Sequence, residues 1–243
     1  MPLLSEKAML NRPDIDVLLK RNEEHCEKHK GDALCLRIVA VADLPTRFGT
    51  FQIVAFFNNK DGKEHVALVH GDICDSTDVP VRLHSECLTG DALGSLRCDC
   101  RDQLIIAMKK VSAMDKGIIL YLRQEGRGIG LLNKIKAYQL QDGGMDTVEA
   151  NRALGFGDDE RDYAVAAEML RALTVKSIKL LTNNPNKMQQ LEKHGINITG
   201  RIPVLIEPNE FNRDYLDTKR RKAGHMLDDL LNGTVKGEKS SRE

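Results

Sequence analysis

The sequence predicts an α/β protein, a three-layer α/β/α sandwich built around a mixed sheet. From about residue 41 onward, short runs rich in β-branched residues alternate with amphipathic helical segments, the order typical of α/β folds. A short polar turn joins the first strands and favours antiparallel hairpins, whereas intervening helices favour parallel pairing of the later strands. With 243 residues, the chain can form one large domain with extensions and bury a sizeable core.

Three regions follow along the chain. Residues 1–40 are predicted to be a partly helical N-terminal extension, with a helix over 14–30 that starts after Pro13 and stops at Gly31. Residues 41–206 form the main domain. Residues 207–243 are predicted to hold a helix over 213–231 and a polar tail without fixed structure.

The elements of the main domain are expected from apolar alternation and from helical periodicity. Strands are predicted over 51–56, 65–70, 79–84, 117–123, 177–182 and 202–207, with the polar segment NNKDGK turning between the first two. Helices are predicted over 101–113, 130–142, 162–173 and 185–194, the last ended by Gly195.

The charge balance argues against a polyanionic or membrane partner. Lys and Arg number 36, as do Asp and Glu, so the formal net charge is zero and no basic surplus suggests nucleic-acid or membrane binding. Apolar runs stay below the roughly 18 residues of a membrane span, and charges interrupt the N-terminus where a signal peptide would be apolar. We therefore expect a cytoplasmic protein, and in that reducing setting clustered cysteines are usually metal-binding or catalytic.

Three of the six cysteines, Cys87, Cys98 and Cys100, lie within residues 84–100. A C-x-C pair is hard to join as a disulfide, whereas three thiolates suit tetrahedral zinc with a fourth position open for a water molecule. Zinc-bound water is a nucleophile at neutral pH, so the spacing indicates a catalytic metal site. Three buried cysteines without metal, or a structural four-cysteine site that recruits Cys74, remain alternatives.

The residues just before Cys87 suggest a competing reaction. His84 and Glu86 form an H-x-E pattern, which zinc nucleobase deaminases combine with a later P-C-x-x-C. Here the second element is C-x-C without a preceding proline, so the match is partial.

A glycine-rich segment, RQEGRGIGLLNK, leaves a predicted strand and enters a predicted helix. Gly126, Gly128 and Gly130 permit close backbone approach, the helix N-terminus offers N–H groups to an anion, and Arg123 and Arg127 add positive charge. The segment matches neither of the common nucleotide-binding fingerprints, so an ordinary strand-to-helix turn is an equally good interpretation.

The segment TNNPNK has the same strand–turn–helix setting. Lys187 in the first helical turn is poorly matched to the helix dipole, which a bound phosphate would explain and a solvated lysine would explain equally well. The acid-rich segment 155–163 lies at a predicted helix start, and the segment 146–154 is similarly ambiguous. Because acids are favoured there for capping alone, composition does not single out Asp159 or Arg161.

Several long motifs, in the same order, resemble GTP cyclohydrolase II, the first committed enzyme of riboflavin synthesis. They are VRLHSECLTGDALGSLRCDC, LYLRQEGRGIGLLNKIKAYQLQD, DTVEANRALGF, DDERDY and LLTNNPNK. The resemblance runs from about residue 41 to 206, is weaker in NRDYLDTKRRKAGHML, and leaves the first 40 residues unaccounted for. It implies that 41–206 is a catalytic domain that opens the imidazole ring of GTP and releases formate and pyrophosphate, giving a diaminopyrimidine ribosylamine 5′-phosphate.

The resemblance also implies a set of site residues. It implies Zn²⁺ on Cys87, Cys98 and Cys100, and Mg²⁺ with the triphosphate. The implied GTP contacts are Arg82, Leu83, His84, Ser85, Glu86, Gln103, Glu125, Gly126, Arg127, Thr147, Thr182 and Lys187. Asp159 is implied as the proton acceptor, Arg161 as the nucleophile and Tyr138 as a participant in ring chemistry. Because a guanidinium is a poor nucleophile, Arg161 is also a candidate for stabilising transition-state charge.

Family members are usually dimers, so the resemblance implies a homodimer. Two other functions stay open at this point. One is a zinc-stabilised module that senses GTP without turning it over. The other is a different purine hydrolase, which either stops after ring opening or deaminates the base.

Overall fold

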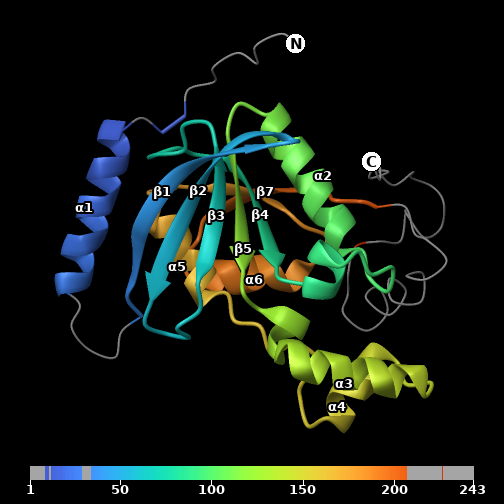
Figure 1. Ribbon diagram of the computed structural model, residues 1–243. Helices are drawn as coiled ribbons and strands as arrows, with labels where there is room; N and C mark the ends of the chain where they lie inside the picture. The colour runs from blue at the N-terminus through green and yellow to red at the C-terminus, as the bar shows by residue number, and fades with distance from the viewer. Residues whose placement is uncertain (1–8, 11, 29–33, 207–225, 227–243) are drawn as a thin grey trace.

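The computed structural model describes residues 9–10, 12–28, 34–206 and 226, and forms one seven-stranded sheet with helices on both faces (Figure 1). Its strands are β1 (Leu36–Thr46), β2 (Gly49–Asn58), β3 (His65–His70), β4 (Val79–Ser85), β5 (Gly117–Leu122), β6 (Ile178–Leu181) and β7 (Ile198–Ile202). Its helices are α1 (Arg12–Lys28), α2 (Cys100–Ala113), α3 (Gly130–Asp142), α4 (Thr147–Ala153), α5 (Ala164–Ala172) and α6 (Pro185–Lys193), with a short π-helical turn at Leu88–Ala92 and a 3₁₀ turn at Glu125–Gly128.

The sheet is mixed, as the sequence predicts. Its order is β1-β2-β3-β5-β4-β6-β7. The first four strands in this order pair antiparallel, and β5, β4, β6 and β7 pair parallel. Short turns can join only antiparallel neighbours, whereas each parallel return needs a crossover, which here contains a helix.

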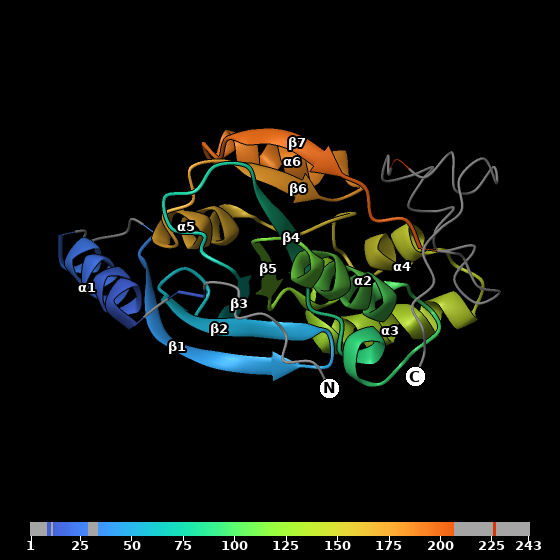
Figure 2. The same ribbon diagram turned by 90° about the horizontal axis from the view of Figure 1, so that it is seen from above.

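The sheet lies between two helical layers. Alternate residues of β5 point to opposite faces, so Leu120 joins a core with α1, α5 and α6, while Ile119 joins a second core with α2. Figure 2 shows α2 and α5 on opposite sides of the central strands. The predicted three-layer α/β/α arrangement is therefore confirmed.

Three local differences from the sequence-based expectation have physical causes. The edge strand β1 was not predicted, because it begins inside the presumed extension and contains Pro45, which an edge strand tolerates. The last strand was predicted over 202–207, but β7 covers Ile198–Ile202 and ends where the predicted strand begins, so that prediction was wrong. Helix α4 was not predicted, since Thr147–Ala153 is only seven residues long. The predicted C-terminal helix over 213–231 lies outside the described residues apart from Met226.

Helix α1 confirms the helix expected after Pro13, and it belongs to the body of the fold. Leu18 is buried in the main core, and the Asn22 side chain donates to the carbonyl of Ala172 at the end of α5. Figure 1 shows α1 alongside β1 at the edge of the sheet.

The parallel strands determine where a site can form. β4, β5 and β6 are neighbours that run in one direction, so their carboxyl ends meet at one edge. The predicted cysteine, glycine-rich and TNNPNK segments each follow one of these strands. Open α/β sheets bind ligands at this edge.

Candidate active site

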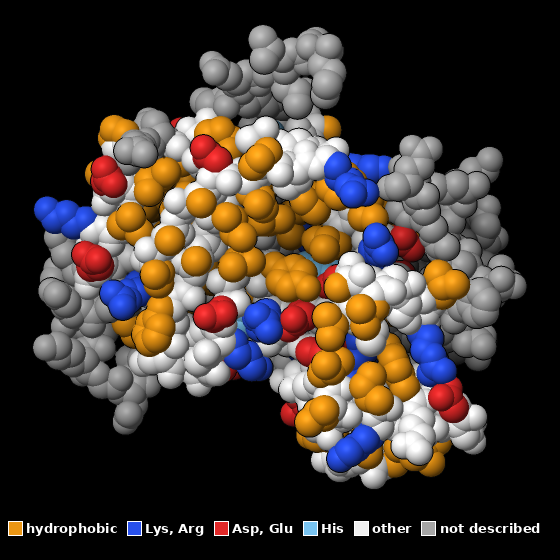
Figure 3. Space-filling view, viewed as in Figure 1, with side chains coloured by type: hydrophobic (Ala, Val, Ile, Leu, Met, Phe, Trp, Pro, Cys, Tyr) orange, Lys and Arg blue, Asp and Glu red, His pale blue; other side chains and the backbone are white. Residues whose placement is uncertain are grey.

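A cavity of about 690 Å³ opens at the carboxyl ends of β4, β5 and β6. This volume is in the range of small-molecule sites. It brings together every predicted site residue except one: Arg82, His84, Ser85, Glu86, Cys87, Cys98, Cys100, Gln103, Glu125, Gly126, Arg127, Tyr138, Thr147, Asp159, Arg161, Thr182 and Lys187. The exception is Leu83, whose side chain is buried in the main core. Figure 3 shows acidic and basic side chains side by side where the lobe of α3 and α4 meets the sheet.

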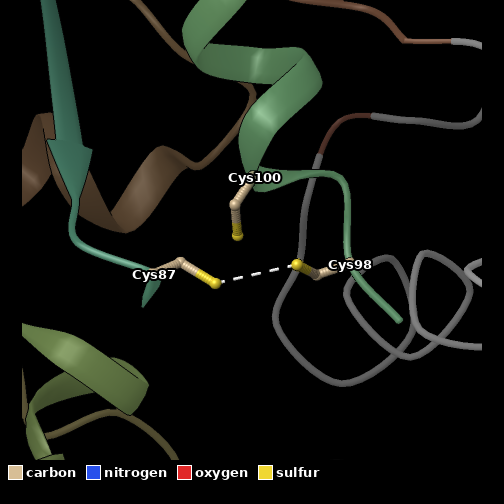
Figure 4. Close-up of side chains that lie close together, drawn as sticks. All are labelled: Cys87, Cys98 and Cys100. Atoms are coloured by element: carbon tan, nitrogen blue, oxygen red, sulfur yellow. Dashed lines mark hydrogen bonds between the residues drawn. The ribbon is translucent and has the colours of Figure 1, made fainter. Parts of the chain in front are cut away.

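The three predicted metal ligands converge from separate parts of the local chain. Cys87 follows β4, Cys98 lies in the connecting loop and Cys100 opens α2, and their sulfurs point toward a common centre (Figure 4). All three sulfurs lie within 4.8 Å of one another, and Cys87 Sγ lies 3.7 Å from Cys98 Sγ. Tetrahedral zinc with Zn–S bonds of about 2.3 Å places its sulfurs roughly 3.8 Å apart, so this spacing suits the metal.

The loop between the ligands leaves room for an ion because Gly90 has no side chain. A Cβ on Gly90 would lie 2.7 Å from Cys98 Sγ and 3.1 Å from Cys87 Sγ. The Gly90 backbone N–H also points to Cys87 Sγ at 3.4 Å. Hydrogen bonds from Cys100 and Cys98 hold the pKa of Cys87 far below its ordinary value, whereas the pKa values of Cys98 and Cys100 are raised, so the negative charge of the cluster is centred on Cys87.

The structure excludes one of the alternatives for the cysteines, the four-cysteine site. Among the described residues, Cys74 is not part of the cluster: it follows β3, and its thiol is hydrogen-bonded to Thr174. A four-cysteine site with Cys74 is therefore excluded. His84 also lies outside the sulfur cluster, because its Nε2 faces the carboxylate of Asp91 at 3.0 Å.

A buried polar network around Asp91 connects the cysteine loop to the sheet. The Asp91 carboxylate accepts hydrogen bonds from the Cys87 backbone N–H at 3.0 Å and from the Tyr121 hydroxyl at 2.9 Å, in addition to facing His84. Burial lowers the pKa of His84 despite this carboxylate, which favours a neutral imidazole. Asp91 therefore ties the first ligand of the cluster to β4 and β5.

A second buried group, the ion pair of Lys134 and Glu125, also contacts the cysteine loop. Lys134 on α3 donates to Cys87 Sγ at 3.1 Å and to Glu125 Oε1 at 2.7 Å. Glu125 Oε2 accepts from the Leu88 backbone N–H at 2.6 Å, and Oε1 also accepts from the Gly126 N–H at 2.8 Å. The Glu125 carboxylate thus connects the glycine-rich turn to the cysteine loop.

Basic side chains from β4 and α6 form another wall of the cavity. Arg82 donates to the Leu181 carbonyl at 3.0 Å and to the Gln103 side chain. Lys187 is buried and donates to the Leu83 carbonyl at 2.9 Å, so it is not the solvated lysine of the alternative interpretation. Leu83 thus holds Lys187 in place through its backbone carbonyl, although Leu83 itself does not line the cavity.

The glycine-rich turn has an unusual backbone. Gly126 and Arg127 both have φ near +60°, and Gly128 has φ +98° at a point where an added Cβ would lie only 3.0 Å from the backbone of Glu160. A non-glycine residue such as Arg127 is uncommon in this region of φ, and such residues cluster at functional sites. Its guanidinium faces the cavity and donates to the Asp158 carbonyl at 3.3 Å.

Asp159 and Arg161 form a close pair in the segment before α5. Arg161 Nε donates to Asp159 Oδ1 at 2.7 Å, and its NH1 lies 3.4 Å from Ser85 Oγ. Burial raises the pKa of Asp159, but the hydrogen bonds and charge of Arg161 outweigh it and lower that pKa. The composition of this segment did not distinguish a capping acid from a site acid. In the structure, Asp162 accepts from the Ala164 N–H at the start of α5, whereas Asp159 pairs with Arg161 at the cavity.

Tyr138 and Thr147 enter the cavity from the lobe of α3 and α4. The Tyr138 hydroxyl lies 3.3 Å from Thr89 Oγ1 in the cysteine loop, and the Arg97 guanidinium stacks 4.9 Å from its ring centroid. Thr147 is the first residue of α4, whose capping box is closed by Asp146 and Glu149. α4 thus lies beside α3 and brings Thr147 to the cavity wall.

Sequence reasoning missed Lys134, Asp91 and Tyr121. The available signals were weak: Lys134 precedes Tyr138 by one helical turn, and Asp91 is an acid between two ligands. Neither pattern distinguishes a buried partner from a surface charge.

No helix in the described part of the chain has the length and apolarity needed to cross a membrane.

Comparison with known proteins supports a single family. A family model described as GTP cyclohydrolase II matches residues 37–203. The GTP cyclohydrolase-2 of Picrophilus torridus is 56% identical over 186 residues, 76% of this chain and 96% of that protein. The GTP cyclohydrolase-2 of Pseudomonas paraeruginosa is 56% identical over 195 residues, 80% of this chain and 95% of that protein.

One solved structure aligns weakly. It is described as a crystal structure of RibBX, a two-domain 3,4-dihydroxy-2-butanone 4-phosphate synthase from A. baumannii, with a TM-score of 0.34 and 17% identity over 74% of this chain and 46% of that chain. A similarity this low does not establish a shared fold. The family match, the identity of the relatives and their near-complete coverage show that the chain belongs to the GTP cyclohydrolase II family of enzymes, as its sequence motifs predict.

Proposed function

We propose that this protein hydrolyses GTP at C8 of the guanine ring with a zinc ion on Cys87, Cys98 and Cys100, and that it releases formate and pyrophosphate. The product would be 2,5-diamino-6-ribosylamino-4(3H)-pyrimidinone 5′-phosphate, in the first committed step of riboflavin synthesis. One observation carries the proposal: a thiol cluster with metal-like spacing and a set of buried cations line the same cavity. For a purine nucleoside triphosphate, the metal held by the thiols would act on the ring, and the cations would bind the phosphates.

The cysteine cluster would hold the metal through three thiolates. Zinc with three protein ligands keeps one position open, where it lowers the pKa of a bound water and supplies a nucleophile at neutral pH. Gly90 keeps the space between the sulfurs clear, and Asp91 fixes the backbone of Cys87.

The phosphate end of the substrate would lie against Arg82, Arg127 and Lys187. All three line the cavity, and Arg82 and Lys187 are buried, so solvent would screen their charges little. Arginine binds phosphate oxygens bidentately, whereas lysine acts as a point charge. Mg²⁺ would bind together with the triphosphate, as the family resemblance implies.

The guanine edge would be read by Glu125 or Gln103. Glu125 already accepts from Lys134 and two backbone N–H groups, and the Gln103 carbonyl accepts from Arg82. Either side chain would therefore exchange an internal hydrogen bond for one to the base.

Asp159 and Arg161 would act at the α-phosphorus. Both carboxylate oxygens of Asp159 accept hydrogen bonds from the Arg161 guanidinium, which orients it and keeps it charged. This arrangement favours a role in stabilising transition-state charge. In the nucleophile assignment, Asp159 would instead draw a proton from Arg161. Trapping a covalent phosphoramidate under single-turnover conditions separates the roles: its presence supports the nucleophile, and its persistent absence supports the charge stabiliser.

Tyr138 would move protons during ring opening. Its hydroxyl approaches the cysteine loop at Thr89, and burial raises its pKa, so it stays protonated and can donate at neutral pH. Glu86, whose Oε2 accepts from Arg123 Nε at 2.9 Å, is a second candidate next to Cys87 in sequence.

The homodimer and the cytoplasmic location stay predictions. Two exposed apolar residues on α3, Leu132 and Ile135, support association of two copies. Figure 3 shows hydrophobic side chains gathered on this lobe. Light scattering over a range of protein concentrations tests the dimer.

The test of the proposed function is product analysis of zinc-loaded protein with GTP and Mg²⁺, with formate and pyrophosphate measured separately. Equal amounts of both, with a diaminopyrimidine product, are expected. Cys98→Ser should abolish metal binding and formate release, and the matched control Cys74→Ser should retain both. Ammonia release would identify a deaminase, and tight GTP binding without either product would identify a sensing module.

A further inference from the structure

Lys134 is a buried lysine with two negatively charged partners. Its side chain comes from α3, and its ammonium donates to Cys87 Sγ at 3.1 Å and to Glu125 Oε1 at 2.7 Å. The ammonium also lies 5.7 Å from the ring centroid of Tyr138, one helical turn away. The predicted GTP, metal and catalytic residues do not include it.

Burying an ammonium group is costly unless its charge is compensated and its protons are hydrogen-bonded. Here the compensation comes from a thiolate and a carboxylate rather than from solvent. The Glu125 partner is itself fixed, because its other oxygen accepts from the backbone N–H of Leu88, which follows Cys87. Lys134 therefore holds Cys87 in two ways. It donates to the sulfur directly, and through Glu125 it is linked to the backbone of the next residue, Leu88.

We infer that Lys134 is a positioning residue that controls the electron donation of Cys87 to the metal and holds this ligand in register with α3. The inference rests on the proposed metal site. Three thiolates and one divalent ion leave a net negative charge, which would repel an anionic nucleotide. A fixed ammonium beside Cys87 partly offsets the charge at that sulfur, and it also balances the Glu125 carboxylate, which would otherwise add to the repulsion.

The hydrogen bond also changes the sulfur as a ligand. A donor directed at a thiolate withdraws electron density from it, so the sulfur donates less and the metal remains a stronger Lewis acid. Outer-shell partners of metal ligands are worth about 10–100-fold in metal affinity or activity. Because the ammonium is directed at the sulfur of Cys87, the effect falls on this ligand of the three.

Cobalt substitution tests this inference. The energy of the thiolate-to-cobalt charge-transfer band reports on the sulfur ligand, and it would not change if Lys134 only supported the fold. Co²⁺ is titrated into wild type, Lys134→Met, Lys134→Arg and the control Lys136→Met, whose lysine is exposed on the same helix. In Lys134→Met, the thiolate-to-cobalt charge-transfer band should move to lower energy, because the sulfur lone pair is no longer stabilised. Its metal affinity, measured by competition with a chelator, should fall on the order of 10–100-fold, because the loss of the contact that positions Cys87 against α3 outweighs the gain in sulfur donation.

The other variants distinguish charge from packing. Lys134→Arg, which keeps a charged donor, should restore most of the band position, and Lys136→Met should match wild type. A Lys134→Met spectrum and affinity equal to those of wild type would overturn the inference. Absence of any thiolate-to-cobalt band in wild type would instead overturn the proposed metal site.

A measurement on the unaltered protein covers the case in which Lys134→Met does not fold. In cadmium-113-loaded wild type with ¹⁵N-labelled lysine, the Lys134 ammonium protons should be protected from solvent exchange and should couple to cadmium through the sulfur hydrogen bond. A freely exchanging ammonium without such coupling would also overturn the inference.

Discussion

Gly90→Ala should remove metal binding while leaving the backbone conformation allowed. The added Cβ would lie 2.7 Å from Cys98 Sγ and 3.1 Å from both Cys87 Sγ and Cys100 Cβ. Ordinary non-bonded contacts lie at roughly 3.5–4 Å, so at least one sulfur must move by about 1 Å. Metal sites tolerate ligand displacements of only about 0.2 Å, so the cluster should no longer close around an ion.

The assay measures zinc per subunit after dialysis, together with thermal unfolding with and without added zinc. Wild type should retain zinc and melt at higher temperature when loaded, because a ligand that binds only the native state stabilises it. Gly90→Ala should lose both the zinc and the shift, and overpacking should cost the metal-free fold about 1–3 kcal/mol. The matched control is Gly200→Ala in β7, where the added Cβ meets only the Lys179 side chain at 3.7 Å.

The result that would refute this reasoning is a Gly90→Ala protein with wild-type zinc content and affinity. Such a protein would mean that the metal is not held between these three sulfurs. Loss of zinc in Gly200→Ala as well would mean that a general loss of stability, not the local clash, explains the effect.

Three further predictions concern the polar groups around the cavity. Arg161 lowers the pKa of the Asp159 carboxyl in the folded state. The ionised carboxylate therefore stabilises the fold above the unfolded pKa of about 3.9, and this contribution is lost as the pH falls through the folded pKa. The difference in unfolding free energy between wild type and Arg161→Met should therefore shrink below about pH 3.9, and a difference independent of pH would contradict the pairing. Lys187→Met removes a buried cation from the cavity wall. A hydrogen bond from such a charged donor is worth about 1.5–3 kcal/mol, so steady-state kinetics should show the KM for GTP rising on the order of tenfold with a smaller effect on kcat. An unchanged KM would exclude Lys187 from GTP binding. Asp91→Asn should lower the free energy of unfolding by about 2 kcal/mol in urea titrations, because a carboxylate surrounded by donors becomes an amide, and an unaltered midpoint would show that the network is not stabilising.

Local patterns predicted most of the fold. The strand over His65–His70 and the helices near 101–113 and 130–142 follow from periodicity, because each segment's own side chains decide which face is buried. Edge strand β1 and the position of β7 were missed, because both depend on pairing with neighbouring strands.

The sequence by itself determined the family and the cluster of three cysteines that could hold a metal. Cys87, Cys98 and Cys100 lie so close along the chain that almost any compact loop brings their sulfurs together, and long collinear motifs identify the family without coordinates. Only the tertiary structure decided that Leu83 turns into the core and that Lys134 reaches Cys87 across 47 positions of sequence. The reason is physical: which face of α3 is buried, and against which sulfur, depends on how the helix docks on the sheet, and spacing along the chain does not encode that orientation.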